Sequence, residues 1–319
     1  MNIAVVGTNF ISDNFINAAT GVSGVSVSAI YSRKLDTGRA FAAKYGINKV
    51  YTDYSLMLED PVIDAVYVAS PNAVHPDQTV RALDSGKHVL CEKMLAPTYR
   101  EYLAMREAAE RSGRVLLEAM RPVHDPFYKI LIDTLPSIGK VRRAHLEFCQ
   151  YSSRYDRFKA GILTNAFDPA MKNSALADIG IYPLTVALLL FGNPRDSVGR
   201  SVFLDNGFEG AGSILLSYPD KTVTVAYSKI SDSTTPSVIE GELGSLHIDK
   251  LTAPRTLTYI PRGEAPCVIQ TPECENNMIY EIEAFRDAAS GIIDPSRFSE
   301  LSDSVMCIAD SVISSSRII

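Results

Sequence analysis

Residues 64–93 read DAVYVASPNAVHPDQTVRALDSGKHVLCEK. This stretch predicts a strand over residues 64–69, a helix over residues 76–84 and a second strand over residues 88–91. The run AVYVA is apolar at every position, which is typical of a strand in a parallel sheet that helices cover on both faces. The stretch therefore predicts one strand–helix–strand unit of a doubly wound α/β domain.

The same alternation runs through residues 1–120 and predicts a Rossmann domain with six strands. The expected strands cover residues 3–6, 25–31, a short run near 50, 64–69, 88–91 and 114–118. The expected helices between them cover residues 11–19, 37–45, 54–59, 76–84 and 99–112.

The pattern changes near residue 121. A helix is expected over residues 175–190, and alternating runs separated by turn signals then predict an antiparallel sheet. Two helices close the chain, over residues 278–290 and 300–315. We therefore expect an NAD(P)-binding Rossmann domain over residues 1–120. An α+β domain for substrate binding and oligomerisation, with a large open-faced and mostly antiparallel sheet, is expected over residues 121–319.

Composition narrows the class of protein. The 319 residues carry 31 basic and 37 acidic side chains, and the net charge of −6 argues against a protein that binds nucleic acid through its phosphates. Five cysteines without a Cys-x-x-Cys pair, and five histidines without close pairing, predict neither a disulfide framework nor a metal site. The sequence shows no signal peptide and no apolar run of about 18 residues, so a cytoplasmic protein without membrane contacts is expected.

The first expected strand runs directly into residues 7–12, GTNFIS, where a helix begins. A dinucleotide pyrophosphate binds at such a helix N-terminus, and the usual fingerprint has glycine at the positions of Gly7, Asn9 and Ser12. Of these three glycines, only Gly7 is present. Asn9 is a tolerable substitute because asparagine adopts left-handed backbone conformations more readily than most residues, and Ser12 is small enough for close packing of the helix on the strand. A tight turn without a ligand would show the same pattern, so both interpretations stay open. The candidate cofactor contacts here are Gly7, Thr8, Asn9, Phe10 and Ile11.

The end of the second expected strand bears on the type of cofactor. An NAD site usually has an acidic residue about 20 positions after the glycines, to bind the ribose 2′-hydroxyl. Here Ser32, Arg33 and Lys34 supply a hydroxyl and two cations instead. These residues suit a 2′-phosphate and favour NADP, with NAD still possible, although a solvated basic turn would look alike.

Residues 69–93 strongly resemble the glucose–fructose oxidoreductase/inositol dehydrogenase family, GFO/IDH/MocA. The shared pattern is Ser-Pro-Asn after a strand, then His, then Ala-Leu-x-x-Gly-Lys-His-Val-x-x-Glu-Lys. Two further matches follow in order, with residues 151–156 (YSSRYD) similar to a dihydrodiol dehydrogenase-like branch and residues 175–182 (ALADIGIY) similar to the Asp-x-Gly-x-His/Tyr helix. The resemblance covers nearly the whole chain.

The resemblance implies hydride transfer between a nicotinamide and a carbinol or carbonyl carbon, often of a sugar or polyol, at a site between the two domains. By motif position, Lys93 matches the lysine of the family's Glu-Lys-Pro motif, and Asp178 and Tyr182 match its downstream acid–base pair. Met94 departs from the motif, in which proline is usual. Family members contact the cofactor around the positions of Ser70, Pro71, Asn72, His75, Glu92 and Lys93.

Lys93, Asp178 and Tyr182 can be given roles in proton transfer. The tyrosine hydroxyl has an ordinary pKa of about 10, and a nearby ammonium favours its phenolate form. The hypothesis is that Tyr182 is the acid–base, Lys93 tunes and anchors it, and Asp178 orients the site from one helical turn away. Competing interpretations are a helix cap for Asp178, a core aromatic for Tyr182 and a solvated cation for Lys93.

Two further groups are candidate contacts. Arg121 and His124 lie at the expected domain junction, where they either contact cofactor or substrate or pack the hinge. Arg154, Tyr155 and Lys159 either bind a polyhydroxylated or anionic substrate or form an ion-paired surface.

The predicted function is an NAD(P)-dependent oxidoreductase for a sugar-like, polyol or related hydroxy/carbonyl compound. The alternative is a non-catalytic sensor of NAD(P) or a metabolite on the same scaffold. The open sheet face predicts a homodimer or homotetramer, because an exposed apolar sheet face favours burial against a partner.

Overall fold

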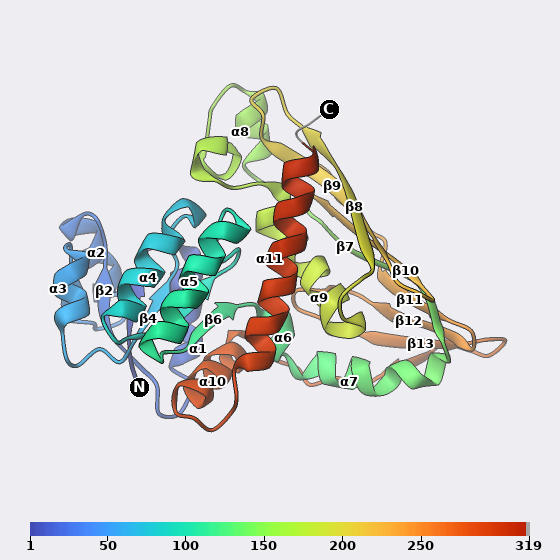
Figure 1. Ribbon diagram of the computed structural model, residues 1–319, viewed down its shortest axis with the longest axis horizontal. Coiled ribbons are helices and arrows are strands. Elements are labelled where there is room, and N and C mark those ends of the chain that lie inside the picture. The colour runs from blue at the N-terminus through green and yellow to red at the C-terminus, as the bar shows by residue number, and fades with distance from the viewer. Residues whose placement is uncertain (317–319) are drawn as a thin grey trace. The chain divides into compact units, whose positions relative to one another are not determined.

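The computed structural model describes residues 1–316, which divide into two compact units (Figure 1). Unit 1 comprises Met1–Arg121 and Glu275–Glu300, and unit 2 comprises Pro122–Cys274 and the chain from Leu301 onward. Residues 275–300 thus return to the unit that contains the N-terminus. The expected division into domains of residues 1–120 and 121–319, whose last three residues lie outside the described part, stays a prediction.

Unit 1 contains a six-stranded parallel sheet in the order β3-β2-β1-β4-β5-β6. The strand order reverses between β1 and β4, and ligands of such sheets bind at the carboxyl ends of the strands beside this reversal. The strands are β1 (Asn2–Val6), β2 (Ser26–Tyr31), β3 (Lys49–Tyr51), β4 (Ala65–Val68), β5 (His88–Glu92) and β6 (Leu116–Ala119). The helices are α1 (Phe10–Ala19), α2 (Leu35–Ala43), α3 (Tyr54–Glu59), α4 (His75–Asp84), α5 (Tyr99–Ser112) and α10 (Met278–Ala289).

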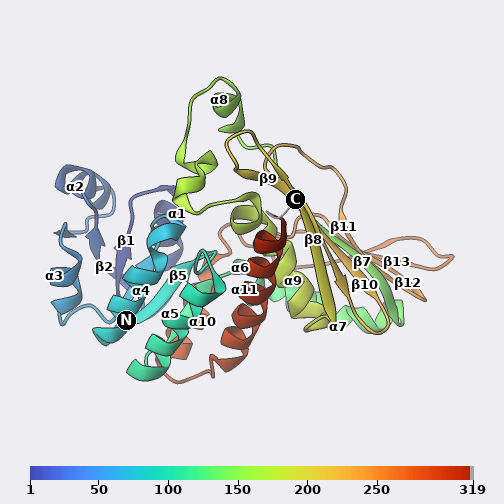
Figure 2. The same cartoon turned by 45° about the horizontal axis from the view of Figure 1, so that its top comes forward.

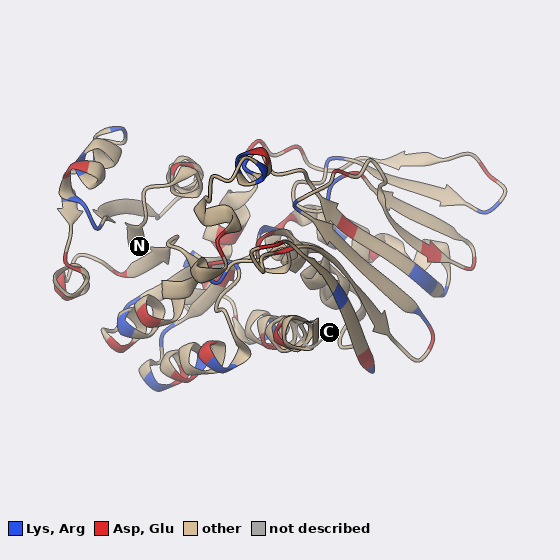
Figure 3. Cartoon of the chain, turned by 90° about the horizontal axis from the view of Figure 1, so that it is seen from above, with Lys and Arg blue, Asp and Glu red and all other residues tan. Residues whose placement is uncertain are grey.

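The central strands of this sheet are buried on both faces. Every residue of β4 is buried, as the apolar run in the sequence predicts. Polar residues define the helix ends: Thr98 accepts a hydrogen bond from the Glu101 N–H, and its hydroxyl donates to the Glu101 carboxylate at 2.7 Å. Acidic and basic residues are interspersed along the helices of unit 1 (Figure 3), including the i,i+4 pair of Arg81 with Asp77.

Unit 2 contains an eight-stranded sheet in the order β14-β13-β12-β11-β7-β10-β9-β8. The pair β10–β7 is parallel, and the remaining neighbours among the described strands are antiparallel. With the parallel sheet of unit 1, this confirms the predicted fold class. The strands are β7 (Val141–Cys149), β8 (Asp196–Phe203), β9 (Glu209–Ser217), β10 (Thr222–Ser228), β11 (Ser237–Gly241), β12 (Gly244–Ile248), β13 (Leu257–Pro261) and β14 (Cys267–Ile269).

The two faces of this sheet differ. Helices α9 (Ile181–Phe191) and α11 (Ser296–Ser316) lie beside one face in both views (Figures 1 and 2). A Cβ on Gly199 of β8 would lie 2.4 Å from Val312 of α11, so glycine permits this close packing. On the opposite face, Val198 and Leu215 pair directly and are 48% and 46% exposed. Among the described residues of unit 2, this face of the sheet therefore has an exposed apolar row.

Three helices that follow β6 were not expected from the sequence: α6 (Arg121–His124), α7 (Pro126–Thr134) and α8 (Tyr155–Lys159). At the start of α7, the Asp125 carboxylate accepts a hydrogen bond from the Phe127 N–H at 3.0 Å, and Pro126 occupies the first helical position. Among the described residues, no helix is long and apolar enough to span a membrane.

Candidate active site

The turn after β1 brings three strand ends of unit 1 together. Gly7 has a φ of +122°, and its N–H donates to the Tyr31 carbonyl at 3.2 Å. A Cβ at this position would lie 2.7 Å from the Ala69 carbonyl oxygen. Only glycine fits this close approach, and the turn leads directly into the positive N-terminal end of the ten-residue helix α1. This geometry fits a dinucleotide pyrophosphate.

Asn9 has a different role from the one expected. Its φ of −98° is extended, so the expected left-handed backbone is wrong. Its side chain instead caps α1, accepting from the N–H groups of Ile11 at 3.0 Å and Ser12 at 3.2 Å. The nearby Asp13 carboxylate faces away from this helix end, since it accepts the Tyr45 hydroxyl at 2.5 Å. A bound phosphate would therefore not meet that carboxylate directly.

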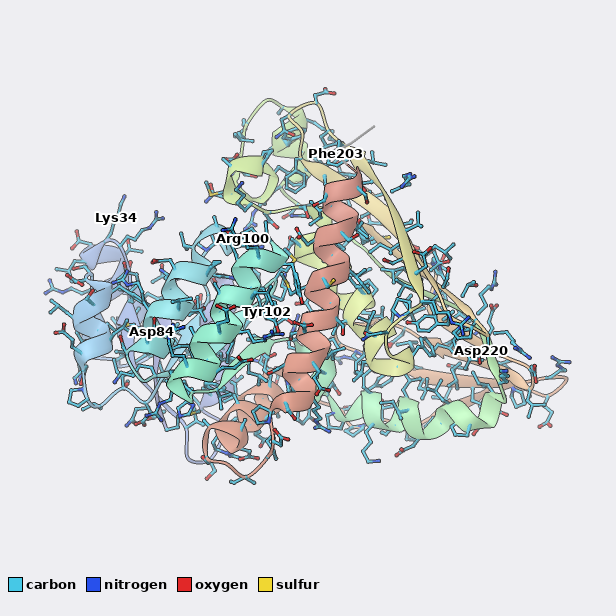
Figure 4. All side chains as sticks on the ribbon, in the orientation of Figure 1. Lys34, Asp84, Arg100, Tyr102, Phe203 and Asp220 are labelled. Atoms are coloured by element: carbon cyan, nitrogen blue, oxygen red, sulfur yellow. The ribbon has the colours of Figure 1, made fainter. Side chains whose placement is uncertain are left out.

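The turn after β2 combines one buried hydroxyl with two exposed cations. The Ser32 hydroxyl donates to the Lys34 carbonyl at 3.0 Å and is buried, so it shapes the turn. The Arg33 and Lys34 side chains are exposed, and Figure 4 shows Lys34 pointing outward beside α2. The turn can therefore present its cations to an anionic group such as a ribose phosphate.

The loops after β4 and β5 are tied together by His75. Its imidazole is buried, with Nε2 at 2.7 Å from the Ser70 carbonyl and Nδ1 at 3.1 Å from the Met94 carbonyl. Burial lowers the pKa of His75 below its ordinary value, so the neutral ring is favoured. His75, an expected cofactor contact, thus holds the loop through which Ser70, Pro71 and Asn72 pass.

Glu92 points into the interior of unit 1. Its carboxyl accepts the Tyr67 hydroxyl at 2.5 Å, and burial raises its pKa while the Lys93 ammonium opposes the shift. Arg121 acts on the same carboxyl as a second cation. Lys93, at the carboxyl end of β5, is half-buried, and the peptide between Lys93 and Met94 is cis.

In unit 2, Asp178 lies in a π-helical turn, Leu176–Gly180, directly before α9. π-helical turns occur frequently at functional sites. The Asp178 N–H donates to the Ser174 carbonyl at 3.0 Å, whereas its carboxylate pairs with the Lys229 ammonium at 2.8 Å. The interpretation of Asp178 as a helix cap is therefore wrong. Sequence analysis missed Lys229; the only signal was a lone cation at the end of an expected strand.

Tyr182 is 6% exposed in the first turn of α9, and its ring packs edge-on against Phe148 at 5.9 Å. Asp178 and Tyr182 thus lie on consecutive turns of one helical segment. Lys93 belongs to unit 1, so the joint site of these three residues stays a prediction.

The expected substrate contacts Arg154, Tyr155 and Lys159 come together at α8. The Lys159 ammonium pairs with Asp156 at 2.8 Å and lies 5.3 Å from the centre of the Tyr155 ring. The hydrogen bond to Asp156 raises the pKa of Lys159. Arg154 is exposed at the start of the helix. Their role in binding substrate stays a prediction. Among the described residues, no group of three or more His, Cys, Asp or Glu side chains is arranged to hold a metal.

Comparison with known proteins gives the family. Residues 1–120 match the model of an oxidoreductase family with an NAD-binding Rossmann fold, and residues 136–247 match the GFO/IDH/MocA C-terminal domain. The chain is 39% identical over 285 residues to the scyllo-inositol 2-dehydrogenase (NADP(+)) of Bacillus subtilis, covering 89% of this chain and 87% of that protein. It is 28% identical over 324 residues to D-xylose 1-dehydrogenase (NADP(+)) 2 of Haloferax volcanii, covering 99% and 97%.

A crystal structure of a 3-ketoreductase from Actinomadura kijaniata, in complex with NADP and TDP-benzene, has the same fold. The TM-score is 0.87 at 24% identity, covering 98% of this chain and 97% of that chain. The predicted family and enzyme class are confirmed, the cofactor prediction agrees with the two named dehydrogenases, and nothing among these relatives supports the sensor alternative. The protein is an NAD(P)-dependent oxidoreductase acting on hydroxy or carbonyl groups, and the chain belongs to the GFO/IDH/MocA family.

Proposed function

We propose that this protein is an NADP-dependent dehydrogenase of cyclic polyols. The observation that carries the cofactor choice is the turn at Ser32, Arg33 and Lys34, which presents cations where an NAD site would have a carboxylate. The substrate class is supported by the 39% identity to a scyllo-inositol 2-dehydrogenase that uses NADP(+). A planar guanidinium at Arg33 can bind a 2′-phosphate and stack on an adenine.

The cofactor, when bound, accepts or donates the hydride at the reacting carbon. The chain's own residues would then manage the proton. Tyr182 takes the hydroxyl proton during oxidation and returns it during reduction, and Lys93 donates a hydrogen bond to the reacting oxygen. Asp178 accepts a hydrogen bond that fixes the orientation of the reacting group. Arg154, Tyr155 and Lys159 contact the remaining hydroxyls.

The Asp178–Tyr182 spacing supports this division of roles. Tyr182 is almost entirely buried, which protects the reacting hydroxyl from water, whereas the Asp178 side chain is 36% exposed and accessible to a polar ligand. Its ion pair with Lys229 holds one carboxylate oxygen, so Asp178 is suited to accept hydrogen bonds and Tyr182 to move the proton.

A second copy of the chain is proposed to cover the open sheet face of unit 2. Val198, Val202 and Leu215 are exposed there on neighbouring strands. Burying such a row stabilises a dimer by the hydrophobic effect. The five thiols are free and suit a reducing compartment, so we place the enzyme in the cytoplasm.

The experiment is an initial-rate assay with a panel of cyclic polyols and aldoses, each with NADP+ and with NAD+. The proposal expects turnover of cyclic polyols and a kcat/KM at least about tenfold higher with NADP+, one charged contact being sufficient for such a difference. Turnover confined to open-chain aldoses would contradict the substrate class, and equal use of both cofactors would contradict the cofactor choice.

A further inference from the structure

Lys229 is a buried cation in unit 2, directly after β10. It is 3% exposed, and its backbone is held on both sides: its N–H donates to the Gly210 carbonyl at 2.9 Å, and its carbonyl accepts the Ser152 N–H at 2.9 Å. A buried ammonium is costly unless it is paired and hydrogen-bonded. A lysine at this position therefore needs specific partners.

Those partners enclose the ammonium. It lies 2.8 Å from Asp178 Oδ2 and 3.1 Å from the Ala166 carbonyl oxygen. The rings of Phe167 and Phe208 lie 5.1 Å and 5.3 Å away, within cation–π range. Two oxygens and two aromatic faces thus fix the ammonium in one place, and only one of these partners is a charged group.

The Asp178 end of the pair is fixed as well. Within the same π-helical turn, the Leu176 N–H donates to the Glu209 carboxylate at 2.9 Å, and Glu209 also accepts the Tyr227 hydroxyl at 2.7 Å. Gly180 of this turn lies so close to Tyr227 that a Cβ would be 2.6 Å from its ring. The turn that carries Asp178 is therefore anchored to β9 and β10. Lys229 contacts one of the two carboxylate oxygens of Asp178.

We propose that Lys229 is a positioning residue for the reaction. Its ammonium holds the Asp178 carboxylate in one orientation, so that Asp178 accepts a hydrogen bond from the reacting group and does not carry the proton itself. The inference rests on the proposed role of Asp178 and adds a residue that acts only through it. A purely structural lysine would fill space between two phenyl rings and stabilise the fold without affecting turnover.

The test uses four variants and one control variant of the full-length enzyme, with NADP+ and the best polyol substrate. Lys229→Met removes the charge and keeps the length, Lys229→Arg keeps the charge, and Asp178→Asn removes the partner. Lys229→Met with Asp178→Asn is the double variant. Val225→Ala is the matched control, because it opens a cavity in the buried core at β10 and its apolar side chain forms no hydrogen bond or ion pair with Lys229 or Asp178. Each variant is also characterised by its thermal unfolding midpoint.

We expect Lys229→Met to lower kcat on the order of 10²-fold, the effect of misplacing a group that orients the substrate by about 1 Å. The KM for NADP+ should change by no more than about twofold. Lys229→Arg should recover part of kcat. The double variant should be no slower than Asp178→Asn, because two residues that act as one unit are not additive. Val225→Ala should lower the unfolding midpoint and retain kcat.

Two results would overturn the inference in different ways. If Asp178→Asn is slow but Lys229→Met turns over at the wild-type rate, Lys229 is structural and the proposed function stands. If Asp178→Asn itself keeps full turnover, the role proposed for Asp178 fails, and the inference fails with it. A Val225→Ala variant that loses kcat as far as Lys229→Met would also assign Lys229 to packing. If Lys229→Met does not fold, Lys229→Gln is compared in the same way.

Discussion

The Asn9 amide nitrogen donates to the Ala69 carbonyl oxygen at 2.8 Å, which ties the turn after β1 to the end of β4. The same side chain accepts two N–H groups of α1. In the usual fingerprint, a glycine at this position keeps the turn compact because it has no side chain. Here the Asn9 side chain keeps the turn compact through its hydrogen bonds. The turn is shaped for the cofactor by a cap as well as by Gly7.

Removing this cap should weaken both the fold and the cofactor site. Asn9→Ala is expected to lower the free energy of unfolding by about 1–2 kcal/mol, the usual loss at a helix N-cap, and Asn9→Gly by less. Denaturant unfolding measures the first effect and fluorescence titration with NADPH the second. Asn17→Ala, on the exposed face of the same helix, is the control. Equal stability of Asn9→Ala and Asn17→Ala would contradict this account of the turn.

Arg33 should carry the preference for NADP. Arg33→Ala is expected to raise the KM for NADP+ by about 10- to 100-fold, as for a lost charged hydrogen bond, and to leave the KM for NAD+ unchanged. Steady-state kinetics with both cofactors measure this. Arg262→Ala removes an equally exposed charge in unit 2 and should change neither value. A parallel rise in both KM values would show that Arg33 supports the turn and does not bind the 2′-phosphate.

Glu281 should make stability depend on pH. It is buried in α10, its two carboxyl oxygens have no hydrogen-bond partner among the described residues, and burial with the neighbouring Glu92 charge raises its pKa well above the ordinary value. Glu118 adds to this shift and Arg121 opposes it. Because the folded state holds the proton more tightly than the unfolded state, folding should lose stability as the pH rises above about 4.3, the ordinary pKa.

Glu281→Gln should therefore unfold at a higher temperature than the wild type at pH 8, and the difference should vanish near pH 4. Thermal unfolding across this range measures it. Glu107→Gln changes an exposed carboxylate of α5 and should show no such trend. A stability difference that is the same at both pH values would exclude titration of Glu281 as the cause.

The open face of the unit 2 sheet should be needed for the proposed dimer to form. Leu215→Arg places a charge in the exposed row opposite Val198 and is expected to yield monomers at micromolar concentration, because burying an unpaired charge opposes association. Light scattering coupled to size-exclusion chromatography measures the mass. Ile292→Arg alters an exposed apolar residue of unit 1 and should leave the mass unchanged. A wild-type protein that is already monomeric would refute the proposed dimer.

Local patterns predicted most of the fold. The expected helices over residues 54–59 and 99–112 match α3 and α5, because caps such as Asp53 and Thr98 and the apolar periodicity act over a few residues. Helix α7 was missed although Asp125 and Pro126 form a start signal. The parallel pair β7–β10 could not be found in this way, since the chain between the two strands contains helices α8 and α9 and two further strands of the same sheet.

The sequence identified candidate residues of the site, but it did not predict the hydrogen bonds and ion pairs that they form. Motif spacing identified Asp178, but its partner Lys229 is distant in the sequence, and only the fold brings the two together. The motif identified His75 as a cofactor contact, whereas its burial against two carbonyls depends on the loop after β5. Asn9 was expected to mimic glycine, whereas its side chain found hydrogen-bond partners that a backbone argument does not consider.

The most direct test of the central claim is the rate of NADPH formation from NADP+ and a cyclic polyol by the wild type and by Tyr182→Phe. The account predicts that the wild type turns over, and that Tyr182→Phe binds NADP+ normally but loses kcat on the order of 10²-fold, the usual contribution of an acid–base residue. Full turnover by Tyr182→Phe would contradict the assignment of Tyr182. A wild type that binds NADPH but oxidises no polyol would contradict the proposed function.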